Sequence, residues 1–163
     1  AIQSALTGHF VLSSLHGTDA VAALHRLLDM GIEAFLVASA IVGVVSQRLL
    51  RKTCDNCKEP YTPGAEELAV FRQHSGGSDK TVFYQGKGCS YCSGTGYRDR
   101  IGVYELLRIT PEIRRLIVGW ATTEELRRLA VAQGMRTMLR EAMQMVDDDI
   151  TTIPEVVRTL FAH

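Results

Sequence analysis

The chain has 163 residues, 46% hydrophobic and 22% charged, a composition typical of a folded globular domain. Eighteen basic residues balance 18 acidic ones, so the basic excess that marks most nucleic-acid-binding proteins is missing. The longest uncharged apolar run, residues 34–47, is too short for a bilayer, which takes about 20 residues. We therefore predict a cytoplasmic domain that binds no nucleic acid.

The N-terminal third of the sequence predicts alternating helices and a strand. The chain begins at Ala1, inside a helical pattern, so we expect a fragment of a longer protein. Residues 9–16, HFVLSSLH, carry apolar side chains at four of eight positions, three of them consecutive, and we take them as a strand buried on both faces in a parallel sheet. Asp19 can cap a following helix that ends at Gly31. A second, very apolar helix is predicted over about residues 33–46.

The sequence changes character over residues 54–109, which we predict to be a small inserted subdomain. It contains two C-x-x-C turns, a short helix near 65–73, a Gly/Ser-rich loop over 75–79, and the strand-like runs TVFYQ and IGVYELLRI. The run GGSDKT (76–81) is not a phosphate-binding loop. Asp79 stands there in place of the second glycine of the G-x-x-x-x-G-K-[ST] pattern.

The last third of the chain reads as helical. Threonines precede three short helical patterns, with proline or glutamate in the first turn, as expected of capped helices. The three starts are Thr110-Pro111-Glu112, Thr122-Thr123-Glu124-Glu125 and Thr152-Ile153-Pro154-Glu155.

All four cysteines, Cys54, Cys57, Cys89 and Cys92, lie in the two C-x-x-C pairs. A reducing compartment disfavours disulfides, and two such turns together can place four thiolates around one zinc ion. Four thiolates leave no open coordination position, so the predicted zinc is structural and stabilises a subdomain too small to hold its own core. Disulfides, metal-free thiols, a redox pair and an iron–sulfur cluster are the alternatives.

Residues next to the cysteines fit a metal site. Three lysines are expected to offset the negative charge of a zinc tetrathiolate, and four glycines permit tight turns that aim backbone N–H groups at sulfur. These residues are Lys52, Lys58, Lys87, Gly86, Gly88, Gly94 and Gly96.

Longer stretches of the sequence carry a resemblance to a known family. LTGHFVLSSLHGTDAVAALHRLLDMGIEAF resembles the histidine box and following helix of the type II/type IV secretion ATPase superfamily, hexameric motors of secretion and pilus assembly. The likeness continues through VSQRLLRKTCDNC, CSYCSGTGYRDRIGVYELL and GMRTMLREAMQMVDDDITTIPEVVRTL. The chain departs from the family at Gly17-Thr18, where Thr-Asn is frequent, and at Asp99, where glycine is frequent.

The resemblance implies an α/β fold in three segments. Residues 1–53 would be the second half of a RecA-like P-loop ATPase domain, 54–109 the tetracysteine zinc subdomain, and 110–163 a C-terminal helical subdomain. The family's P-loop, Asp box and Walker B segment would lie upstream of Ala1, so we expect this fragment alone to be inactive.

The resemblance also implies a function and partners. The full-length protein would be a homo-hexamer that uses ATP and Mg²⁺ to power type II secretion or type IV pilus assembly. It would work in the cytoplasm, held at the inner membrane by a membrane platform and cytoplasmic docking proteins.

The family's two histidine-box histidines match His9 and His16. If residues 9–16 form a strand, roughly 23 Å separate its ends, so both side chains cannot contact one γ-phosphate. His16, at the carboxyl end where ligands of α/β sheets gather, is the predicted catalytic residue, a γ-phosphate sensor or polariser. His9 is expected to be structural or to lie at a subunit interface. Arg48 is a further candidate for a phosphate or subunit contact.

A non-enzymatic function is the main alternative. CSYCSGTGY resembles the C-x-x-C-x-G-x-G unit of zinc-knuckle cochaperones, which would make the chain an interaction module. The first pair, CDNCKEPY, lacks the glycines of that unit. A zinc ribbon that binds nucleic acid is a third hypothesis, which the zero net charge disfavours.

Overall fold

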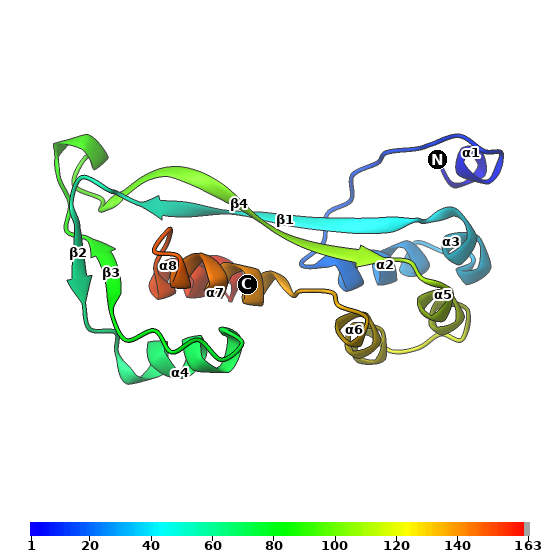
Figure 1. Cartoon of the computed structure of the whole chain (residues 1–163). Helices are drawn as coiled ribbons and strands as arrows, with labels where there is room; N and C mark the ends of the chain where they lie inside the picture. The colour runs from blue at the N-terminus through cyan, green and yellow to red at the C-terminus, as the bar shows by residue number, and fades with distance from the viewer. Residues whose placement is uncertain (162–163) are drawn as a thin grey trace. The chain divides into compact units, whose positions relative to one another are not determined.

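The computed structural model describes residues 1–161, a mixed α/β chain that divides into two compact units (Figure 1). Unit 1 comprises residues 1–46 and 105–137. Unit 2 comprises residues 47–104 and those from 138 onward. None of the helices described is long and apolar enough to cross a membrane.

The secondary structure of residues 1–161 consists of short helices and two small sheets, each of two strands, β1 with β4 and β2 with β3. In chain order the elements are α1 (Ile2–Leu6), α2 (Ala20–Asp29), α3 (Ala34–Ala40), β1 (Gly43–Thr53), β2 (Lys58–Tyr61), α4 (Ala65–His74), β3 (Phe83–Gly86), a single 3₁₀ turn (Ser90–Cys92), β4 (Tyr97–Arg108), α5 (Pro111–Val118), α6 (Thr123–Ala132), α7 (Met138–Asp147) and α8 (Ile153–Leu160).

The long strands β1 and β4 run antiparallel and contribute residues to both units. Bonds just beyond their ends define the direction: Ile109 N donates to Val42 O at 3.0 Å, and Cys54 N donates to Gly96 O at 2.9 Å. The two-residue alternation of burial along β4 places Val103 and Leu107 inside, as expected for a strand with one covered face.

The prediction of a helix over about 33–46 was wrong for its second half. The helix α3 ends at Ala40, and the chain is extended from Gly43 onward as β1. Valines 42, 44 and 45 explain the difference, since β-branched side chains favour an extended backbone that can pair with a neighbouring strand.

The prediction of a buried strand over residues 9–16 was also wrong for this chain. The segment has no regular structure, and the side chains of Phe10 and Leu12 are each 85% exposed. A central parallel strand needs a strand on each side to satisfy its backbone groups, and no strand within residues 1–161 pairs with this segment.

Unit 1 is built from capped helices around an apolar core. Asp19 caps α2 as predicted, its Oδ1 accepting from Ala22 N at 2.9 Å. Thr110 and Thr122 cap α5 and α6, and the capping box of α6 is complete. The buried core of this unit is Ala20, Val21, Leu24, Leu28, Ala34, Val37, Ala38, Leu107, Ile109, Ile113, Ile117, Leu126, Ala130 and Met135.

Unit 2 packs α4, α7 and α8 together with the β2–β3 hairpin and parts of the long strands. Phe71 of α4 meets Phe83 of β3 edge-to-face, with ring centroids 5.0 Å apart. Two methionines of α7, Met138 and Met143, are buried in this core and act as packing residues. The C-terminal helices thus share a core with the cysteine-bearing segment.

Candidate metal centre

The four cysteine sulfurs converge on one point in unit 2, at the base of the β2–β3 hairpin. All four Sγ atoms lie within 4.8 Å of one another. The Sγ–Sγ distances are 3.9 Å for Cys54–Cys89, 3.8 Å for Cys57–Cys92 and 3.7 Å for Cys89–Cys92. A disulfide would need about 2.05 Å, so the thiols are free. The cluster is able to hold one metal ion.

Backbone and side-chain N–H groups point at the sulfurs. Cys92 Sγ accepts from Cys89 N at 3.1 Å and from Gly96 N at 3.3 Å, and Cys57 Sγ accepts from Gly88 N at 3.3 Å. Asn56 Nδ2 donates to Cys89 Sγ at 3.4 Å. Such donors stabilise negative charge on sulfur and orient the ligands of a metal site.

Glycines make these turns possible, as predicted. Gly88 and Gly96 have φ angles of +98° and +75°, which side-chain-bearing residues rarely adopt. Gly86 runs against Gly96 so closely that an added Cβ would overlap the Gly96 carbonyl. This packing closes the loop around the second C-x-x-C turn, and two backbone hydrogen bonds, from Cys54 N to Gly96 O at 2.9 Å and from Lys87 N to Cys57 O at 3.0 Å, join that loop to the first C-x-x-C turn.

The hydrogen bonds and burial set different acidities for the thiols. The N–H of Cys89 is the main cause that lowers the pKa of Cys92 to about 6, and the Asn56 amide lowers the pKa of Cys89. Burial raises the pKa of Cys57 to about 12. The lowered pKa of Cys92 favours its thiolate, the form that binds metals.

The role predicted for the three lysines stays a prediction, and the structure shows the following contacts for them. Lys58 Nζ donates to the carbonyl of Asp149 at 2.6 Å, and Lys87 Nζ lies 3.9 Å from a carboxylate oxygen of Glu59. The contacts of these two ammonium groups are thus with oxygen atoms. Lys52 lines a cavity next to Cys54.

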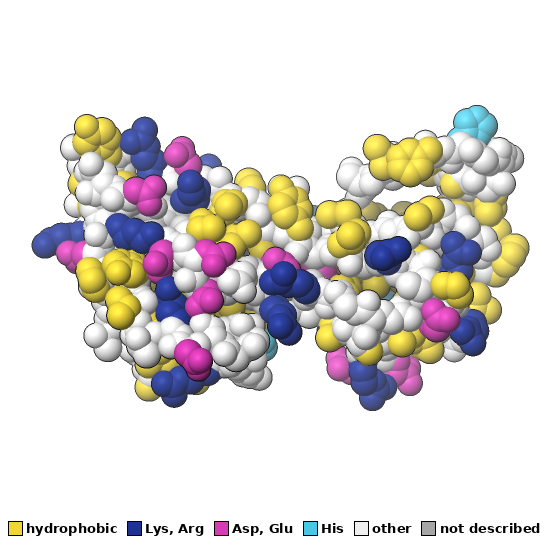
Figure 2. Space-filling model, viewed as in Figure 1, with side chains coloured by type: hydrophobic (Ala, Val, Ile, Leu, Met, Phe, Trp, Pro, Cys, Tyr) yellow, Lys and Arg dark blue, Asp and Glu magenta, His cyan; other side chains and the backbone are white. Residues whose placement is uncertain are grey.

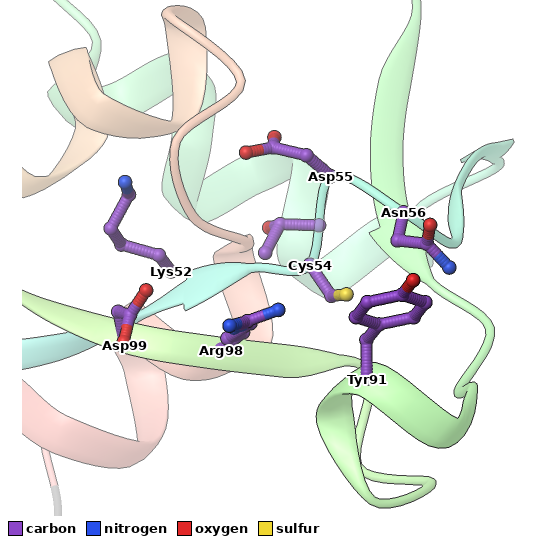
Figure 3. A pocket seen from close by; sticks show the side chains of 8 residues that line it. Lys52, Cys54, Asp55, Asn56, Tyr91, Arg98 and Asp99 are labelled. Atoms are coloured by element: carbon purple, nitrogen blue, oxygen red, sulfur yellow. The ribbon is translucent and has the colours of Figure 1, made fainter.

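That cavity, of about 530 Å³, opens beside the cysteine cluster (Figure 3). The Arg98 guanidinium points toward the Tyr91 ring, with 5.9 Å between Cζ and the ring centroid. Asp99 also lines the cavity and has a φ of +65°, a conformation that favours glycine. The remaining lining residues are Lys52, Thr53, Cys54, Asp55 and Asn56.

Charged groups of both signs are distributed over the surface around these features. On the face shown in Figure 2, Lys and Arg side chains are interspersed with Asp and Glu. This distribution agrees with the zero net charge of the sequence.

The predicted nucleotide-site residues are exposed or half-buried. His16 lies in the irregular segment before α2, and His9 Nδ1 lies 3.2 Å from Thr7 Oγ1. Arg48 is half-buried on β1, in unit 2. The structure brings together the four cysteines, whereas the roles of the two histidines and Arg48 stay predictions.

The burial of two carboxylates was not predicted from the sequence. Glu105 and Glu155 are each only 1% exposed. Glu105 lies between Val103 and Leu107 on the buried face of β4. A charged residue at an apolar position of the alternating pattern could have indicated this buried carboxylate from the sequence. The capping box predicted at Thr152 is half formed: Thr152 Oγ1 accepts from Glu155 N at 3.3 Å, but the Glu155 carboxylate binds Arg51 and Arg158.

Comparison with known proteins decides the family. The family model described as "Type II/IV secretion system protein" matches residues 1–158. The chain belongs to this family. It is 38% identical over 157 residues to "Type IV pilus assembly ATPase PilB" of Thermus thermophilus, covering 96% of this chain and 18% of that protein. It is 39% identical over 161 residues to "Type II secretion system protein E" of Pseudomonas aeruginosa, covering 97% and 31%.

A further relative supports the same family, and a solved structure has a similar fold. The "Type II secretion system ATPase E" of Vibrio cholerae is 37% identical over 158 residues, covering 97% of this chain and 31% of that protein. Among solved structures, the Yersinia pseudotuberculosis ATPase DotB superposes with a TM-score of 0.61 at 19% identity, covering 98% of this chain and 32% of that chain. This structural similarity shows that the two chains share a fold. The family member described here thus spans less than a third of the length of these relatives.

Proposed function

We propose that this chain is the C-terminal part of a hexameric ATPase that powers type II secretion or type IV pilus assembly. The observation that carries the proposal is the family match over residues 1–158, joined by relatives named as ATPases of both systems. In the full-length protein ATP and Mg²⁺ would bind mainly to residues outside this chain, because no G-x-x-x-x-G-K-[ST] loop occurs in it.

The proposed architecture has three segments. Residues 1–53 supply the second half of a RecA-like domain, 54–109 carry the zinc subdomain, and 110–163 form the helical subdomain, of which residues 162 and 163 lie outside the described part. The exposed apolar residues Phe10 and Leu12 support the first assignment, since they would be covered by neighbouring strands of a complete sheet.

The metal proposed for the cysteine cluster is zinc. A tetrahedral site with bonds of about 2.3 Å has sulfurs about 3.8 Å apart, and the separations of 3.7–3.9 Å fit that value. Cys54, Cys57, Cys89 and Cys92 would be the four ligands, and the ion would supply cross-linking. The function proposed for the ion is to stabilise the two C-x-x-C turns, because four thiolates leave no coordination position for a substrate.

The proposed contact with nucleotide is His16, which would donate a hydrogen bond to charge developing on the γ-phosphate. His9 and Arg48 are proposed to act in packing or at subunit interfaces. We further propose a cytoplasmic location, with attachment to an inner-membrane platform through docking proteins; relatives named as type II secretion system proteins support a role within such a machine. No role for nucleic acid is proposed, since the net charge is zero.

The test is ATP hydrolysis by the full-length protein. His16→Ala should lower kcat by about 10²–10³ with little change in KM for ATP, because other residues supply most ground-state binding. His9→Ala is the matched control, and any defect it has should shrink at high protein concentration, as expected for an assembly role. A full-length protein without ATPase activity would favour the cochaperone-like interaction module.

A further inference from the structure

The irregular segment that carries His16 packs against the first turn of α2. Gly17 lies directly against that turn, and an added Cβ would stand 3.0 Å from Ala23 Cβ and 3.3 Å from Ala23 Cα. Ala20 and Val21, the first two residues of the helix, are fully buried. The position of residues 16–18 therefore depends on where α2 begins and how it is held.

The first backbone N–H of α2 is bonded by a carboxylate from far along the chain. Ala20 N has no acceptor inside its own helix, as is general for the first four N–H groups. It donates instead to Glu105 Oε1 at 3.0 Å, in a buried environment. Without that acceptor, a fully buried N–H would lose its bond. The negative charge also suits the positive end of the helix dipole.

A second carboxylate supports the same turn. Asp19 Oδ1 accepts from Ala22 N at 2.9 Å, and its Oδ2 accepts from Arg127 Nη2 at 3.0 Å. Arg127 belongs to α6, so β4 and α6 both hold the start of α2. All these residues lie in unit 1.

We propose that Glu105 is a positioning residue for His16. Its carboxylate fixes the start of α2, and the contact between Gly17 and Ala23 passes that placement to the neighbouring histidine. The consequence for catalysis rests on the proposed role of His16 in ATP hydrolysis. The consequence for the order of residues 16–24 does not depend on it.

The test uses three variants of the full-length protein. Glu105→Leu suits the apolar row of β4 but removes the acceptor, whereas Glu105→Gln keeps an acceptor oxygen of similar shape. Glu124→Leu, at an exposed position in unit 1, is the matched control for loss of a carboxylate. The readouts are hydrogen exchange of residues 16–24, kcat, and KM for ATP.

The leucine variant should raise exchange at the start of α2 about tenfold or more, since a protecting bond is lost. It should lower kcat between about tenfold and a hundredfold, with KM within about twofold, because a misplaced group weakens the transition state more than binding. Glu105→Gln should restore most of both properties, and Glu124→Leu should change neither.

Each contrary outcome has a distinct meaning. Unchanged exchange in Glu105→Leu would overturn the proposal. Faster exchange with normal kcat would limit Glu105 to the fold and refute its positioning role, provided that His16→Ala is impaired. A normal His16→Ala would refute the proposed nucleotide contact, and exchange alone would then decide whether Glu105 orders the segment. If the leucine variant does not fold, Arg127→Ala serves instead, with smaller expected effects in the same direction.

Discussion

Arg51 binds the buried carboxylate of Glu155 through three donors. Its Nε and Nη2 donate to Oε2 at 2.9 and 2.6 Å, and its backbone N donates to Oε1 at 3.0 Å. Arg158 adds two further bonds of 2.9 and 2.7 Å. The Tyr97 ring lies 4.2 Å from the Arg51 guanidinium, and its hydroxyl meets Thr152 Oγ1 at 2.7 Å. This cluster connects β1 and β4 to the start of α8.

The first prediction concerns the pH dependence of unfolding. Burial raises the pKa of Glu155, but hydrogen bonds from Arg158 and Arg51 outweigh it and lower the pKa to about 2. The unfolded carboxyl titrates near 4.3, so the stabilisation is complete above about pH 4.3 and is lost as pH falls toward 2. Glu155→Gln should lower the free energy of unfolding by about 3 kcal/mol at pH 7 and reduce its pH dependence below pH 5.

Denaturant unfolding monitored across pH 2–7 would check this. Glu66→Gln, at an exposed position of α4, is the control and should change stability by less than about 0.5 kcal/mol. A Glu155→Gln variant with the same acid dependence as the parent protein would show that Glu155 is not the titrating group.

The second prediction concerns the metal. The reduced, chelator-free protein should contain about one zinc per chain, as measured by elemental analysis. Cys89→Ser should abolish stoichiometric zinc binding. It should also speed hydrogen exchange over residues 54–61 and 86–97, because the two C-x-x-C turns lose their cross-link. Helices α5 and α6 should keep their exchange rates, since they pack in the core of unit 1.

Ser90→Ala is the matched control for the metal prediction. Ser90 is exposed and lies next to Cys89, but it offers no sulfur. This variant should retain the metal. Metal-free protein after purification under reducing conditions would contradict the zinc assignment and leave metal-free thiols as the alternative.

The third prediction concerns backbone strain at Asp99. Its φ of +65° disfavours residues with a Cβ by roughly 1 kcal/mol, whereas glycine adopts it freely. Asp99→Gly should therefore be more stable than Asp99→Ala by about 1 kcal/mol. At Arg100, where φ is negative, the order should reverse, because glycine weakens an ordinary strand position. Thermal melts of the four variants would decide, and the same order at both sites would refute the strain.

The fourth prediction concerns the chain by itself. The 163-residue chain should not hydrolyse ATP, because its sequence contains no G-x-x-x-x-G-K-[ST] loop, the element whose backbone N–H groups would hold the β- and γ-phosphates. Phosphate release would be compared with that of the full-length protein and of a heat-inactivated sample. Turnover above the inactivated background would mean that a complete phosphate site lies within these residues.

The sequence alone determined the features that depend on local chemistry. The spacing of Cys54, Cys57, Cys89 and Cys92 predicted a shared site, because C-x-x-C turns and their glycines fix sulfur positions over a few residues. The caps at Asp19, Thr110 and Thr122 were likewise predictable, since a cap bonds to an N–H only two or three residues away.

Only the tertiary structure decided features that depend on distant partners. Residues 9–16 have the composition of a buried strand, yet without neighbouring strands among residues 1–161 they form none. The chain after Ala40 pairs with β4 rather than continuing as a helix. Glu105 and Glu155 accept hydrogen bonds from the backbone N–H groups of Ala20 and Arg51, which lie 85 and 104 residues away in the sequence. The physical reason is that sheet pairing and the burial of a charge are satisfied by groups that folding brings together, which a local pattern does not specify.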